Sequence, residues 1–171
     1  MDGSSSEDTS TGDPPPDGPP DGEYLLAFST VVDPAHPIQF LATVEPSDAP
    51  GGGYTLDVSL QRLTLDVMST TSPREPFGAP FDVLIDVAAD GEFELALDDL
   101  DIPGPTNPIT GSDLVASVVL EGNIDMGGQW CGDGSGTITQ PLLLDLTGST
   151  FAFTPVEDDE LPGDPVPAAC D

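Results

Sequence analysis

The stretch FDVLIDVAADGEFELAL, residues 81–97, decides the fold class. Every odd position on either side of its central Ala-Asp-Gly is apolar, which is the period of a strand with one buried face. A three-residue loop at 89–91 places all these residues on one face and puts Gly91 where a left-handed residue is needed. The stretch therefore predicts a β-hairpin with the cross-strand pairs Val87–Phe93, Ile85–Leu95 and Val83–Leu97.

Similar short apolar runs, punctuated by Gly and Pro, fill residues 23–156. They predict an all-β domain: an antiparallel β-sandwich, or a flattened β-barrel, of about eight or nine strands. An outer-membrane barrel would need an apolar outer band and aromatic girdles, whereas alternate positions here are often Asp, Glu, Ser or Thr. The predicted strands are 24–32, 38–45, 53–68, 80–88, 92–98, 113–121, 124–130, 136–146 and 150–155.

Two local patterns predict how strands turn and bend. A two-residue loop at Gly148-Ser149 would set Leu146 opposite Phe151 and Leu144 opposite Phe153 in a hairpin. Within 54–67 the apolar residues change from even to odd positions, which would turn the second half of a continuous strand outward. We expect a bulge near Gln61-Arg62 to restore the phase and bend the strand.

The charge balance is strongly acidic. The chain has 32 acidic residues, two basic ones (Arg62 and Arg74) and a formal net charge of -30. Such a chain repels nucleic acid phosphates and anionic lipids, so we expect neither as a partner. Cations, basic proteins and glycans remain candidate ligands. We also expect a monomer, because acidic surfaces discourage edge-to-edge pairing of open sheets, and we expect salt to stabilise the fold.

The two ends of the chain differ from the middle. After Met1, residues 2–22 contain only Asp, Glu, Ser, Thr, Gly and Pro, so we expect a disordered stalk. Residues 157–171 form an acidic, Pro-rich tail. The run from Asp2 to Asp13 resembles the linker of mature Gram-negative bacterial lipoproteins, in which it follows a lipidated cysteine. That resemblance implies a lipid anchor upstream of Met1 and a secreted or outer-membrane-anchored location.

The two cysteines, Cys131 and Cys170, predict one disulfide that ties the tail back to the strands. It would close a loop of roughly 40 residues, and the loop entropy corresponds to about 4 kcal/mol of stabilisation. A disulfide is typical of an oxidising compartment, which agrees with export. No run of 18 apolar residues is present, so we expect no transmembrane helix.

Conventional catalytic motifs are missing. The only histidine, His36, lies between two prolines and is expected in a surface turn. Residues 131–136, CGDGSG, depart from the serine-protease motif because the serine does not follow the Asp directly, and we expect a Gly-rich turn there. Gly128-Gln129-Trp130 resembles the Gly-x-Trp of lipocalins, which implies an interior cavity for a small apolar ligand. Its expected lining is Phe40, Leu56, Phe81, Ile85 and Phe93.

Carboxylate clusters are the other candidate sites. Asp98, Asp99 and Asp101 are expected at a strand end, where their oxygens could bind Ca²⁺. Further clusters are Asp125 with Asp133, and residues 157–160. Two carboxylates could also form a glycosidase pair. We expect no other cofactor.

The sequence thus favours a non-enzymatic, surface-exposed domain of a bacterial envelope protein that binds an unknown protein or glycan, or serves a structural role. Two alternatives remain open at this point: a lipocalin-like carrier of a small apolar ligand, and a carboxylate-dependent hydrolase.

Overall fold

The computed structural model describes residues 21–48, 53–124, 130–156, 161 and 163–170. These described residues form nine strands and one short 3₁₀ helix at Gly104–Thr106. The strands are β1 (Gly22–Thr30), β2 (Asp33–Asp48), β3 (Tyr54–Leu65), β4 (Pro73–Val87), β5 (Glu92–Ile102), β6 (Leu114–Ile124), β7 (Trp130–Gln140), β8 (Leu144–Asp145) and β9 (Ser149–Pro155).

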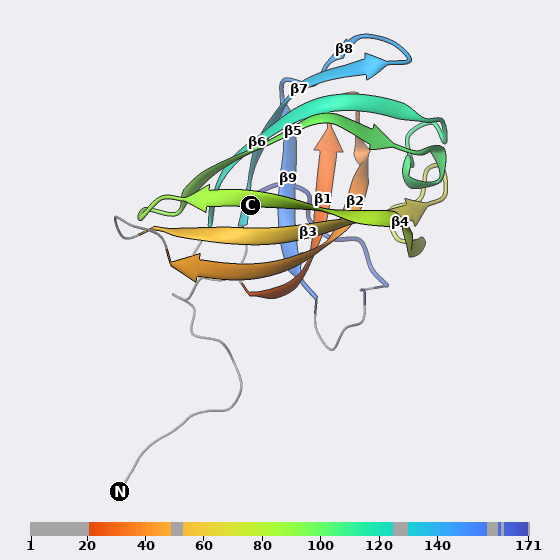
Figure 1. Ribbon diagram of the computed structural model, residues 1–171. Helices are drawn as coiled ribbons and strands as arrows, with labels where there is room; N and C mark the ends of the chain where they lie inside the picture. Colours follow the sequence, from red (N-terminus) through yellow and green to blue (C-terminus); the bar gives the residue numbers. More distant parts are fainter. Residues whose placement is uncertain (1–20, 49–52, 125–129, 157–160, 162, 171) are drawn as a thin grey trace, which may run out of the picture.

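Eight of the strands form a closed antiparallel barrel (Figure 1). The order around the ring is β6-β5-β4-β3-β2-β1-β9-β7, and β7 pairs again with β6 to close it. The two-residue β8 pairs only with β7 and lies outside the ring. The all-β prediction is therefore confirmed, and of the two architectures expected from the sequence the barrel is the one observed.

The interior of the barrel is aromatic toward one end. The Trp130 ring stacks on Phe153 with centroids 3.7 Å apart, and Tyr24 and Phe93 meet its edges at 5.5 and 5.7 Å. Trp130 is fully buried, and its Nε1 has no hydrogen-bond partner. Edge-to-face and stacked pairs of this kind add to the free energy of burial. Toward the other end the interior is mainly aliphatic.

A second apolar layer lies on the outside of the wall. Leu25 and Ala27 are fully buried, although they alternate along β1 with the inward-facing Tyr24, Leu26 and Phe28. Because successive side chains of a strand point to opposite faces, these residues face outward under a covering segment. The other buried apolar side chains outside the interior cluster are Leu63, Leu65 and Ala152.

This outer layer explains why the predicted bulge in β3 is wrong. The β2–β3 ladder runs without interruption from Asp48–Tyr54 to Phe40–Arg62, so β3 keeps its phase. Leu63 and Leu65 do turn to the outer face, where they are buried rather than exposed. The irregularity lies instead in the partner strand β4, between the positions opposite Leu60 and Arg62.

Two other sequence interpretations are corrected. Residues 131–136 form the middle of β7 rather than a turn, because their glycines let the strands approach closely: a Cβ on Gly132 would lie 2.0 Å from the carbonyl oxygen of Glu121. The turn at Gly148 exists, but Leu144 pairs with Ile138 instead of Phe153. Strand β9 is flanked by β1 and β7, so no edge remains for Leu144.

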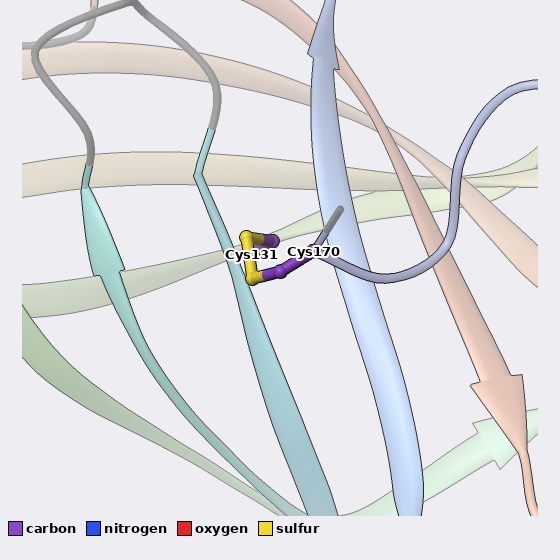
Figure 2. The surroundings of a disulfide bond; sticks show 2 residues. All are labelled: Cys131 and Cys170. Atoms are coloured by element: carbon purple, nitrogen blue, oxygen red, sulfur yellow. A yellow bond between two sulfur atoms is a disulfide. The ribbon is translucent and has the colours of Figure 1, made fainter.

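The C-terminal tail is fastened to the barrel at both ends. Val156 N donates to Glu23 O at the start of the tail, and Cys170 forms the predicted disulfide with Cys131 of β7 (Figure 2). The disulfide is thereby confirmed, with the two Cα atoms 5.3 Å apart.

Between these two points Arg74 holds the tail to the wall. Its buried guanidinium donates to Asp164 O at 2.9 Å, to Gln39 Oε1 at 2.8 Å and to Thr70 O at 3.0 Å. Gln39 lies on the outer face of β2, directly beside Ala27 of the outer apolar layer. Arg74 therefore joins the tail, the 66–72 segment and the barrel wall at one point.

Candidate functional site

The predicted hairpin of β4 and β5 forms only at its tip. Val87 pairs with Phe93, and Gly91 takes the expected positive φ of 93°. Beyond that pair the strands diverge, so the predicted pairs Ile85–Leu95 and Val83–Leu97 are not made (Figure 1). The barrel wall consequently has a seam between β4 and β5, where two strand edges lack a backbone ladder.

Local sequence explains why no ladder forms farther along the two strands. Pro76 and Pro80 of β4 have no N–H to donate, and proline within a sheet is confined to edges and bulges. In β5 the register with β6 shifts between Leu97 and Leu100, and Asp99 takes a left-handed φ of 50°. This is a β-bulge, a feature that bends a strand and interrupts regular pairing. Both strands thus carry devices that favour separation.

Arg62 closes the seam at its far end. It projects from β3 on the same face as Leu60, its guanidinium lies 5.0 Å from the centre of the Phe81 ring, and its Nε donates to Asp101 O of β5 at 2.7 Å. Burial lowers the pKa of Arg62, and Asp101 opposes that shift. A single side chain therefore bridges β3 and β5 where a β4–β5 ladder would otherwise stand.

A surface cleft of about 300 Å³ follows the seam, which we call the seam cleft. The three candidate metal ligands Asp98, Asp99 and Asp101 all lie on it and are exposed. They lie within β5, at and beyond its bulge, not at a strand end as expected. The lining is completed by Arg62, Phe81, Val83, Ala96, Leu97 and Leu100.

Among the described residues no three His, Cys, Asp or Glu side chains are grouped closely enough to hold a metal ion. Calcium binding by Asp98, Asp99 and Asp101 stays a prediction. Its test is the melting temperature in Ca²⁺ against NaCl of equal ionic strength: a larger rise with Ca²⁺ supports a site. Of the other clusters, Asp125 and residues 157–160 lie outside the described residues.

A larger open groove of about 1090 Å³ lies at the β4–β5 turn, at the opposite end of the seam from Arg62, and shares no lining residue with the seam cleft. It crosses the outer face of β5, β6 and β7, and we call it the acidic groove. Glu94 lies opposite Glu121, which in turn lies opposite Asp133, so three carboxylates stand in register across three strands. Like charges directly opposite each other destabilise a sheet. Asp86 and Glu92 add two further carboxylates to the lining.

The interior offers far less space. One cavity of about 30 Å³ lies in the aliphatic half, and its lining is apolar except for Thr30. Of the residues expected to line a ligand cavity, only Phe40 does so. Leu97 and Leu100 line both this cavity and the seam cleft, so they form the wall between them. The volume suits a molecule of one or two heavy atoms.

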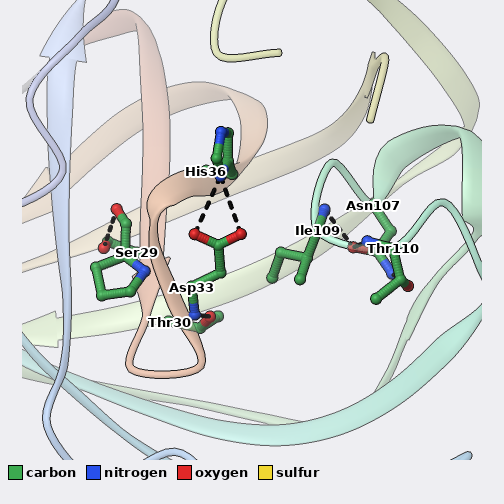
Figure 3. Close-up of polar contacts among 8 residues, drawn as sticks. Ser29, Thr30, Asp33, His36, Asn107, Ile109 and Thr110 are labelled. Atoms are coloured by element: carbon green, nitrogen blue, oxygen red, sulfur yellow. Dashed lines mark hydrogen bonds and ion pairs between the residues drawn. The ribbon is translucent and has the colours of Figure 1, made fainter. Parts of the chain in front are cut away.

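His36 lies near the start of β2 and is half-buried, rather than in a surface turn as expected; the β1–β2 turn itself is at residues 31–32 (Figure 3). Its Nδ1 lies 2.9 and 3.0 Å from the two carboxylate oxygens of Asp33. Among the described residues no serine hydroxyl lies within hydrogen-bonding distance of this ring, so a Ser-His-Asp arrangement is not assembled there. Figure 3 also shows Asn107, whose side chain organises the 103–113 loop that carries Ile109 to the cavity.

Comparisons with protein-family models, with curated proteins and with solved structures gave no significant match. The described residues contain no helix with the length and apolar character needed to span a membrane.

Sequence reasoning missed the roles of both arginines. The chain has a net charge of -30 and only two basic residues. That rarity was a signal that each arginine has a specific partner within the fold. Pro76 and Pro80 were the available signal for an edge at β4. The bulge in β5 also had a signal, because the apolar residues change from odd to even positions between Leu97 and Leu100.

Proposed function

We propose that this domain is a non-enzymatic binding module that captures a lysine- or arginine-bearing partner protein on its acidic groove. The observation that carries the proposal is the row Glu94, Glu121 and Asp133, in direct register across β5, β6 and β7. This row costs folding free energy, so folding alone does not favour it. A cationic partner would offset the repulsion on binding.

The charge distribution supports a basic partner over a glycan. Arg62 and Arg74 both make intramolecular contacts, and the chain has no lysine, so the groove meets its partner with carboxylates alone. A field of one sign speeds the encounter with an oppositely charged partner and excludes like-charged ones. Export and lipid anchoring belong to the same proposal, because the disulfide and the acidic linker suit an oxidising envelope compartment.

The test is calorimetric titration with a lysine-rich peptide and with a glutamate-rich peptide of equal length. We expect binding of the lysine-rich peptide only, weakening as NaCl shortens the screening length to ~8 Å at physiological ionic strength. The double variant Glu94→Gln/Glu121→Gln should bind more weakly yet melt at a higher temperature, because it relieves the repulsion.

The matched control is Glu45→Gln/Asp57→Asn, which removes the same charge from an opposed pair on β2 and β3 that does not line the groove. Binding that is equally weakened by both double variants would show a response to net charge alone, and would overturn the assignment to the groove.

A small-ligand carrier is the second candidate, and the apolar cavity behind Leu97 and Leu100 is the observation that favours it. Xenon should then perturb the signals of these two leucines. Unchanged leucine signals at saturating xenon would remove this candidate.

A further inference from the structure

The β4–β5 seam leaves two facing strand edges without lateral partners. Strand β4 pairs with β3 on its other side, and β5 with β6, but between them only Val87 and Phe93 pair. Unpaired strand edges present rows of N–H and C=O groups that a further strand can join. An eight-stranded barrel normally has no such edge.

We propose that an extended, basic segment of a partner protein enters this seam and pairs through its backbone with the edges of β4 and β5. The proposal rests on the proposed function and specifies how the partner is held. In this view the acidic groove receives the flanking part of the same segment, since Asp86 and Glu94 belong to the strands of the seam and also line the groove.

The length of the segment follows from what bounds the seam. The Val87–Phe93 pair closes one end, and the Arg62 bridge to Asp101 closes the other. Between these limits lie residues 82–86 of β4 and residues 94–100 of β5. At about 3.3 Å per residue, the shorter edge, that of β4, spans ~17 Å and accommodates about five residues of an extended chain.

The side chains along the seam specify the pattern of that segment. On β4, Asp82 and Asp86 flank Leu84, an apolar residue that is 69% exposed. On β5, Glu94 and Asp98 flank Ala96. Since lateral neighbours in a sheet meet on the same face, the outward positions of the segment should read basic-apolar-basic. Inward positions would meet Val83 and Leu97 of the seam cleft, which suits small apolar side chains.

Charge decides against the other occupants that could supply a strand. A second copy of this chain would bring a net charge of -30 against the same acidic edges. Residues 2–22 of the chain carry only acidic charges and no apolar side chain, so they lack both parts of the pattern. A partner with lysine or arginine on both sides of an apolar outward residue satisfies charge and pairing together.

The experiment compares two peptides of sequence Lys-Val-Val-Val-Lys, one normal and one with N-methylated valines. Both carry the same charge, but the second lacks the N–H groups that a strand needs. We expect the N-methylated peptide to bind at least about tenfold more weakly, which corresponds to 1.4 kcal/mol. On binding the normal peptide, amides of 83–86 and 94–97 should become protected from hydrogen exchange.

Variants locate the effect. Asp82→Asn/Asp86→Asn should weaken binding of the normal peptide more than the charge-matched control Glu45→Gln/Asp57→Asn. Equal binding of the two peptides would overturn strand pairing while leaving the proposed function standing. Absence of binding by either peptide at low salt would overturn both.

Discussion

Replacing Arg74 by methionine should detach the C-terminal tail from the barrel. Methionine retains an apolar stem of similar length but none of the five N–H donors. The loss of Arg74 affects its three acceptors differently. Asp164 O belongs to an exposed residue and can accept from water instead. Thr70 O still accepts from Gln39 Nε2. Gln39 Oε1 is left buried without a donor, because Gln39 is only 1% exposed.

The magnitude follows from these partners. An unsatisfied buried acceptor costs about 1–3 kcal/mol, and each lost bond from a charged donor about 1.5–3 kcal/mol. Burial of the guanidinium is unfavourable and lowers the pKa of Arg74. Removing that desolvation cost opposes these losses. We expect a net loss of about 3 kcal/mol, or a fall of ~6–12 °C in melting temperature for a chain of this size.

The assay is thermal and urea unfolding followed by the near-ultraviolet circular dichroism of Trp130. The charge-matched control is Arg62→Met, which removes one hydrogen bond and the contact with the Phe81 ring at a half-exposed site and should cost about 1.5 kcal/mol. The reasoning is refuted if Arg74→Met unfolds within ~0.5 kcal/mol of the unmodified protein, the range typical of inert surface changes.

Three further outcomes are expected. Reduction of the Cys131–Cys170 bond, 39 positions apart, should lower the free energy of unfolding by about 4 kcal/mol in denaturant titrations of oxidised and reduced protein. Added NaCl should raise the melting temperature by screening the net charge of -30, and a flat or falling response would contradict this. Burial raises the pKa of Tyr24, so stability should hold below pH ~10 and fall as pH rises through the higher folded-state pKa. Tyr24→Phe should reduce that alkaline loss, measured by unfolding as a function of pH.

Period-two patterns predicted most of the fold because each strand has one face in the barrel core. They failed where a strand is buried on both faces, and where the edge of a strand has no ladder partner. The phase change at Leu63 predicts a bulge as long as outward residues are exposed. Leu63 instead faces outward and is buried in the outer layer near Arg74. That layer lies beside the tail and the 66–72 segment, which Arg74 joins to the barrel wall. The tail is distant from β1 and β3 in sequence, and the 66–72 segment has no regular conformation.

The candidate site was predictable in composition but not in place. The sequence singled out Asp98, Asp99 and Asp101, and the structure brings them to a seam beside Arg62 rather than to a strand end. The hairpin tip was predicted correctly because turn chemistry at Gly91 is local. The divergence beyond it was not, because it reflects the combined demands of two prolines in β4, a bulge in β5 and closure of the whole ring.

The open seam is the claim on which the binding account depends, and amide hydrogen exchange with cross-strand NOEs measures it directly. The account predicts that, in the free protein, amides of 83–86 and 94–97 that point into the seam exchange rapidly, whereas amides bonded to β3 and β6 are protected. It also predicts no backbone NOEs between Ile85 and Leu95. Uniform protection, together with Ile85–Leu95 and Val83–Leu97 NOEs, would show a continuous hairpin and contradict the account.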